Sequence, residues 1–217
     1  MGAKGDETTP DWAAEAEQRV LDAALTLSPD TGWNARLVTR AAAAAGLSLG
    51  DAELLLPNGA HDLAALAAQR HLDRTFERLQ GVDPQALKIR ERIRLAVETK
   101  VEATLEDGPA LRTQAGFFLL PPNLPLAVRL LWESADALWR WAGDTATDEN
   151  HYSKRAILAV ILATTLAIRM NSGQDAAREH LAARIEDVMR FERWKAGLKP
   201  WDLGRQVAQA LAALRYR

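Results

Sequence analysis

The stretch WRWAGDTATDENHYSKR, from Trp139 to Arg155, decides how the fold is interpreted. A helix that carries tryptophans ends at Gly143, where a helix C-terminus favours a residue that tolerates positive φ. A short acidic loop follows, and the next helix begins with Lys154 and Arg155 before it turns almost purely apolar. The stretch therefore predicts two consecutive helices that bring aromatic, acidic and basic groups to one corner.

Helix signals recur along the rest of the chain, and no sustained alternation of apolar and polar residues predicts a strand. Asp83 before Pro84 is typical of an N-cap followed by a first-turn proline. Pro121 and Pro122 predict a break before the tryptophan helix. The pattern predicts an all-α fold of about ten helices, near residues 11–28, 34–45, 48–56, 60–80, 84–106, 109–119, 124–142, 149–171, 175–194 and 199–215.

Composition limits the classes of function. The 217 residues include 27 basic and 29 acidic side chains, a net charge of −2, so no overall basic field attracts nucleic acid. The absence of cysteine excludes disulfides and thiolate chemistry. None of the four histidines lies in a helical metal-binding spacing, and no nucleophile-elbow or phosphate-loop motif occurs. We therefore expect no catalytic residue, no metal site and no enzyme activity.

Residues 1–10 are small or polar and predict a disordered tail without a secretion signal or transit peptide. The longest apolar run, from Ala156 to Ile168, is shorter than the roughly 20 residues of a membrane span. We therefore expect a buried helix in a soluble cytoplasmic protein. A helix that is apolar on every face needs a covering of protein or of lipid, and the residues alone leave both open.

Residues 11–80 have the outline of a helix-turn-helix, with Gly46-Leu47-Ser48 at the turn. Their order and lengths resemble the TetR-type regulators, whose third helix enters the DNA major groove. In this chain the third helix carries Asp51, Glu53 and three leucines, with no Arg, Lys, Asn or Gln to contact base edges. The sequence therefore predicts a degenerate helix-turn-helix that binds no nucleic acid. A ligand-responsive transcription regulator of the TetR type is the alternative.

Further motifs follow in a fixed order: Leu119-Leu120-Pro121-Pro122-Asn123-Leu124-Pro125, Leu138-Trp139, Ala142-Gly143-Asp144, Thr147-Asp148, Asn150, Tyr152 and Lys154-Arg155-Ala156. In this order and spacing they resemble the ninth coenzyme Q biosynthesis protein family, accessory factors of ubiquinone synthesis with a TetR-like fold. The resemblance covers about residues 15–192.

The resemblance implies a non-catalytic protein that holds an isoprenoid lipid or quinone intermediate among its C-terminal helices. It implies presentation of that lipid to the di-iron demethoxyubiquinone hydroxylase. We expect the lipid to be lined by Leu120, Leu124, Val128, Leu131, Trp132, Leu158, Ile161, Leu162 and Thr165. The family motif maps the partner surface onto Asp136, Asp144, Asp148, Asn150, Tyr152 and Arg155, and we add Trp141 and His151. His151 replaces a tryptophan that is common in the family.

The last helix is amphipathic, and its apolar positions predict an interfacial membrane helix. These positions are Trp201, Leu203, Val207, Leu211 and Leu214. A helix docked on its own domain would show the same pattern. The predicted organisation is a tail (1–10), a helix-turn-helix-like region (11–80), a lipid-binding bundle (81–194) and a linker with the amphipathic helix (195–217). The resemblance implies a homodimer at the inner membrane surface of a bacterium.

Overall fold

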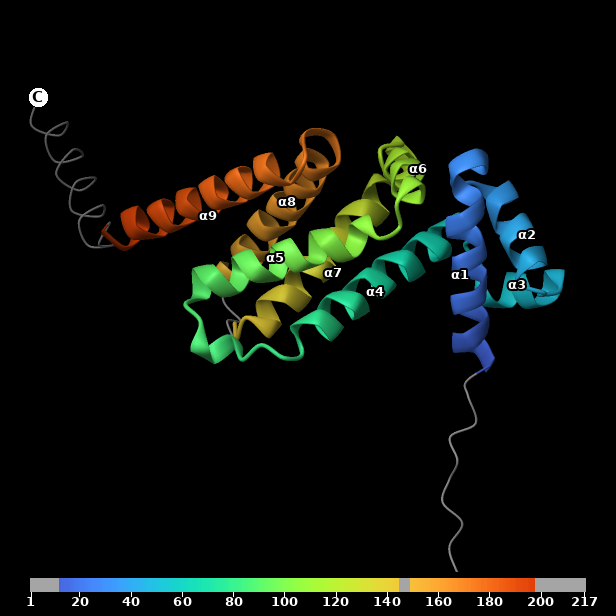
Figure 1. The fold of residues 1–217 in the computed structure, drawn as a ribbon, viewed down its shortest axis with the longest axis horizontal. Coiled ribbons are helices and arrows are strands. Elements are labelled where there is room, and N and C mark those ends of the chain that lie inside the picture. The colour runs from blue at the N-terminus through green and yellow to red at the C-terminus, as the bar shows by residue number, and fades with distance from the viewer. Residues whose placement is uncertain (1–11, 145–148, 198–217) are drawn as a thin grey trace, which may run out of the picture. The chain divides into compact units, whose positions relative to one another are not determined.

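The computed structural model describes residues 12–144 and 149–197, and the side chains among them except those of 149–150 and 191–197. Over these residues the chain forms α-helices and short 3₁₀ helices, without a strand (Figure 1). The elements are α1 (Trp12–Thr31), α2 (Ala35–Ala44), α3 (Leu49–Leu55), α4 (Ala60–Leu79), η1 (Pro84–Ala86), α5 (Ile89–Leu105), α6 (Pro109–Phe118), η2 (Pro121–Asn123), α7 (Leu124–Trp141), α8 (Glu149–Ser172) and α9 (Gln174–Gly197). The predicted all-α class is confirmed.

The chain divides into two compact units, one that ends at Thr164 and one that begins at Thr165. In the first unit α4 packs against α5 and α7, so the helix-turn-helix region and the following helices form one body. The division falls inside the bundle predicted for residues 81–194. The helix expected near 199–215, with its membrane-facing positions Trp201, Leu203, Val207, Leu211 and Leu214, lies outside the described residues.

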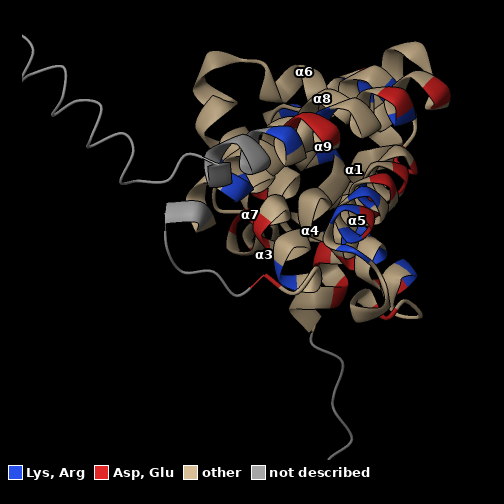
Figure 2. Cartoon of the chain, turned by 90° about the vertical axis from the view of Figure 1, so that its left-hand side faces the viewer, with Lys and Arg blue, Asp and Glu red and all other residues tan. Residues whose placement is uncertain are grey.

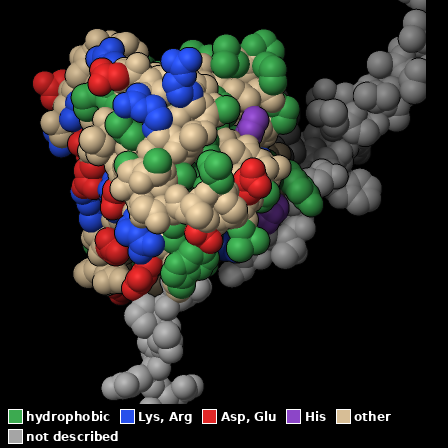
Figure 3. Space-filling view, turned by 90° about the vertical axis from the view of Figure 1, so that its right-hand side faces the viewer, with side chains coloured by type: hydrophobic (Ala, Val, Ile, Leu, Met, Phe, Trp, Pro, Cys, Tyr) green, Lys and Arg blue, Asp and Glu red, His purple; other side chains and the backbone are tan. Residues whose placement is uncertain are grey.

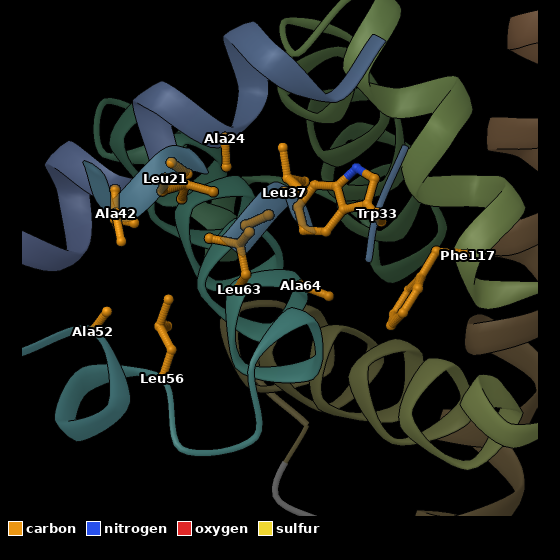
Figure 4. Close-up of a cluster of buried hydrophobic side chains, with 13 residues drawn as sticks. Leu21, Ala24, Trp33, Leu37, Ala42, Ala52, Leu56, Leu63, Ala64 and Phe117 are labelled. Carbon is orange, nitrogen blue, oxygen red and sulfur yellow. The ribbon is translucent and has the colours of Figure 1, made fainter. Parts of the chain in front are cut away.

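The N-terminal helices enclose a hydrophobic core (Figure 4). Leu21 of α1, Leu37 of α2 and Leu63 of α4 are fully buried in it. Phe117 of α6 packs against Trp33, with ring centroids 6.4 Å apart, and so joins the following helices to the same core. Burial of large apolar side chains from four helices fixes the helix-turn-helix outline that the sequence predicts.

Local hydrogen bonds set the ends of these helices. Asn34 accepts from the Leu37 amide at 3.1 Å and caps α2. Ser48 and Asp51 form a reciprocal capping box at the start of α3. Asp83 caps as predicted, but the helix that it starts is only η1, since Leu87 and Lys88 are extended and α5 begins at Ile89. The single helix predicted over residues 84–106 is therefore wrong at its start.

Helix α8 is longer than the apolar run inside it. Between His151 and Ser172 it contains an 18-residue window with a mean hydropathy of 1.3, so by length and composition alone it could cross a membrane. The uninterrupted apolar run Ala156 to Ile168 is still shorter than a span, and the helix reaches this length only with flanking charged and polar residues such as Arg169. Core helices of soluble proteins pass the same test, and only 28% of the apolar window is buried. Val160 is 63% exposed, so α8 is not covered on every face.

Candidate functional site

The corner between α7 and α8 is built around a buried guanidinium. Arg155 is only 2% exposed, although it lies in the second turn of α8. Its Nε donates to Asp136 Oδ1 at 2.5 Å, and its Nη1 donates to Asp144 Oδ2 at 3.0 Å and to the His151 carbonyl at 3.2 Å. One cation thus joins a carboxylate on α7, a carboxylate beyond its end and the backbone of α8. A buried charge needs such partners because desolvation is costly.

Lys154 adds a second connection beside Arg155. Its Nζ donates to Asp144 Oδ1 at 2.7 Å and lies 5.4 Å from the centre of the Trp139 ring. The indole Nε1 of Trp139 donates in turn to the Lys154 carbonyl at 3.1 Å. The indole N–H of Trp139 is therefore hydrogen-bonded, and its ring face lies beside the Lys154 ammonium in a favourable cation–π contact.

The ion pairs shift the acidity of Asp144. Burial alone would raise the pKa of this carboxyl, but the hydrogen bonds and charges of Lys154 and Arg155 outweigh burial and hold its pKa below the usual value. Asp144 is therefore ionised at neutral pH, and the corner keeps its opposite charges. Arg140 also contacts Asp136 at 2.5 Å, so that carboxylate is shared by two guanidinium groups.

Helix α5 fixes the end of α7 through a residue that the sequence did not single out. Arg92 Nη1 donates to the Ala142 carbonyl at 2.7 Å, and its Nε donates to the Leu87 carbonyl at 2.9 Å. Gly143 follows with φ +89°, as its position in the sequence predicts. A Cβ at Gly143 would lie 3.2 Å from both Arg92 Nη1 and Gln85 Nε2. No local motif identifies Arg92, because its partner is 50 residues away.

The predicted partner residues separate into buried and exposed groups. Asp136 and Asp144 are each bonded to the buried Arg155, and Trp141 is half-buried. Tyr152 is 65% exposed, and its ring stacks on Trp132 with centroids 6.1 Å apart. His151 is half-buried and meets the Tyr152 ring edge-on at 5.2 Å. The side chains of Asp148 and Asn150 lie outside the described residues.

Some of the residues predicted to line the lipid are exposed, and others are buried. Leu120, Leu124 and Val128 are 54%, 46% and 64% exposed. Leu131 and Trp132 are half-buried, whereas Leu158, Ile161 and Leu162 are buried in the first unit. Thr165 is buried in the second unit, and its hydroxyl has no hydrogen-bond partner among the described residues. We call Leu120, Leu124, Val128, Trp132 and Tyr152 the apolar strip. Their side chains contribute apolar surface just before α7, along its first half and at the start of α8.

A buried ionic cluster between α4 and the end of α5 was not predicted. Asp107 is buried, lies 2.6 Å from His71 Nε2 and accepts from Arg74 at 2.9 Å. Lys100 is buried nearby, and burial lowers its pKa to about 7, against the attraction of Asp107 and Asp73. A signal for Lys100 exists in the sequence, since Val97, Val101 and Thr104 place it on the apolar side of α5.

His71 stays neutral in this cluster at neutral pH. Burial lowers its pKa, and the positive charge of Lys100 adds to that effect, while the hydrogen bond to Asp107 opposes it. Within the described residues, no group of three His, Asp or Glu side chains is arranged to hold a metal ion. The cluster is therefore best described as a polar link between helices.

Comparison with known proteins gives two kinds of likeness. Residues 124–192 match the COQ9 family model, a range that contains the corner and most of the apolar strip. The chain is 31% identical to the ubiquinone biosynthesis protein COQ9, mitochondrial, of Rattus norvegicus over 85% of its own length, and 30% identical to that of Homo sapiens over 87%. It spans 59% of the length of each of these relatives.

The fold has a solved counterpart. A TetR transcriptional regulator from Nitrosomonas europaea ATCC 19718 superposes with a TM-score of 0.61, covering 81% of this chain and 97% of that one at 16% identity. This likeness confirms the predicted TetR-like fold and carries no statement about function. The resemblance inferred from the order of the motifs is also confirmed: residues 124–192 match the COQ9 family model, and most of the chain is similar to ubiquinone biosynthesis COQ9 proteins.

Proposed function

We propose that this protein is a non-catalytic accessory factor of ubiquinone biosynthesis that binds an isoprenoid lipid or quinone intermediate. The observation that carries the proposal is the apolar strip beside the ion-paired corner, inside the segment that matches the COQ9 family. Exposed leucine and valine side chains on a soluble helix favour an apolar occupant. The names of the similar proteins place those relatives in ubiquinone biosynthesis.

In this proposal the corner serves as the docking surface for the di-iron demethoxyubiquinone hydroxylase. Tyr152 is the exposed aromatic anchor, and aromatic side chains dominate binding at many protein interfaces. Arg155 is buried, so its contribution is to hold Asp136 and Asp144 in place. The lipid on the strip then lies next to the enzyme that receives it, at the inner membrane surface. A homodimer and a membrane-facing C-terminal segment complete the proposal.

The first test is solvent extraction of the purified protein, followed by mass spectrometry of the extract. A stoichiometric polyisoprenoid or ubiquinone precursor supports the proposal, and an extract without lipid overturns it. Val128→Asp places a charge on the strip and is expected to lower the recovered lipid at least tenfold. Leu49→Asp, at a similarly exposed apolar residue on α3, is the matched control and should leave the lipid content unchanged.

Docking needs a separate test. Tyr152→Ala is expected to weaken binding to the purified hydroxylase at least tenfold in a titration, since it removes the exposed ring. Trp12→Ala removes an exposed aromatic ring on α1 and should have no effect. Equal affinity of the Tyr152→Ala variant and the unmodified protein would remove the corner from the interface.

The TetR-like fold raises transcription regulation as a second candidate. The third helix, which such regulators place in DNA, carries Asp51 and Glu53 without a basic residue. Basic and acidic side chains are interspersed over the helices seen in Figure 2, in keeping with the net charge of −2. Carboxylates beside phosphates oppose binding. A gel shift with the upstream DNA of its own gene is expected to show no complex at physiological salt.

A further inference from the structure

A second surface lies on the N-terminal part of the first unit, apart from the corner. A hollow of about 550 Å³ is bordered by α1, α3, α4 and α7. Its apolar lining includes Leu54, Leu55, Pro57, Leu66, Leu72 and Leu130. Leu54 is 73% exposed at its edge, so the hollow is an open groove with a leucine rim. Figure 3 shows hydrophobic side chains, in green, at the surface on the side that carries the N-terminal helices.

The charges around this groove are mainly negative. Glu17, Asp62 and Glu133 line it together with one cation, Arg129, a formal balance of −2. Asp62 accepts hydrogen bonds from the Asn58 backbone and side chain, which hold its carboxylate in place at the groove. Arg129 lies 3.8 Å from Glu133, and both side chains are more than half exposed, so this pair is weak. We call this surface the acidic groove.

The dimensions of the acidic groove suit a short helix. Its lining on α4 runs from Asp62 to Leu72, roughly 15 Å at the rise of an α-helix, which equals about three turns of a bound helix. Amphipathic helices bind such grooves through apolar residues spaced three and four apart. A bound helix with positively charged side chains would complement the acidic rim of the groove.

We propose that the acidic groove docks a basic amphipathic helix of a partner protein. The third helix, α3, which carries no basic residue, supplies Leu54 and Leu55 to this site. The inference does not rest on the proposed lipid function. Leu130 in the groove and Val128 in the apolar strip are about 160° apart around α7, so the two surfaces use roughly opposite sides of one helix.

The test uses the full chain and a fluorescein-labelled 14-residue peptide of leucine and lysine, with leucines spaced three and four apart. Fluorescence anisotropy should show saturable binding, whereas the same peptide with glutamate in place of lysine should not bind. Leu54→Ser and Glu133→Lys should each weaken binding at least tenfold. Leu119→Ser, equally exposed but outside the groove, and Glu77→Lys on the surface of α4 are the matched controls.

Three results would overturn the proposal. Equal losses for Leu54→Ser and Leu119→Ser would show unspecific apolar adsorption. Equal binding of the lysine and glutamate peptides would remove the charge argument. A self-association that Leu54→Ser abolishes in sedimentation velocity, without peptide, would assign the groove to a second copy of this chain.

Discussion

Arg155 shows how a single residue holds the corner together. Its guanidinium is almost fully buried between two carboxylates, so Arg155→Met leaves Asp136 and Asp144 without their shared partner. Breaking a buried ion pair by removing one member costs about 3–5 kcal/mol. Urea unfolding at pH 7 should show a loss of that size. Arg19→Met breaks an exposed pair at 4.0 Å and is expected to change stability by less than about 1 kcal/mol; a similar loss in both variants would contradict this account.

Asp144 gives the same corner a defined acid response. Because its folded pKa is depressed, the ionised carboxyl stabilises the protein above its ordinary pKa, and this stabilisation is lost as the pH falls through the lowered value. Asp144→Asn should therefore unfold at lower urea concentration at pH 7 and lose less stability than the unmodified protein between pH 5 and about pH 3. Parallel acid curves for the two proteins would show that Asp144 does not titrate in this way.

Lys100 also makes stability rise with pH, but over a higher pH range, because burial disfavours its charged form. Its folded pKa of about 7 lies below the ordinary 10.5, so between these values the unfolded chain binds more protons and stability rises with pH. The slope from this one group approaches about 1.4 kcal/mol per pH unit. Lys100→Met should remove the rise between pH 7 and pH 9 and increase stability at pH 7. Lys88→Met, at an exposed lysine, should keep the rise; a rise that persists in Lys100→Met would refute the assignment.

At the scale of the helix, Gly143 decides how α7 turns into the loop. Its φ of +89° costs a residue with a Cβ about 1–2 kcal/mol, and the added carbon would also press on Arg92 and Gln85 at 3.2 Å. Gly143→Ala should therefore lower the free energy of unfolding by at least that amount and weaken hydroxylase docking. Gly116→Ala, inside α6 with open space around the position, should be neutral or stabilising.

Local sequence signals predict the helices, but they do not predict the contacts between helices. Asp83 and Gly143 act at helix ends as the sequence predicts, because capping depends on residues only a few positions apart in the chain. Arg92, His71 and Asp107 depend on partners 36 to 50 residues away, which no single-sequence pattern records. The motif match placed the corner residues together, but only the structure shows that Arg155 is buried rather than presented to a partner.

For the whole molecule, the proposed lipid acts as a ligand of the folded state only. A ligand present at 100 times its dissociation constant stabilises the folded protein by about 2.7 kcal/mol. The detergent-extracted protein should therefore unfold several degrees below the protein as purified, and added quinone lipid should restore the difference. Val128→Asp should show the lower unfolding temperature before extraction and no change after it, whereas Leu49→Asp should behave as the unmodified protein. If extraction leaves the unfolding temperature of the unmodified protein unchanged while lipid is recovered, the lipid does not bind the folded chain at the apolar strip.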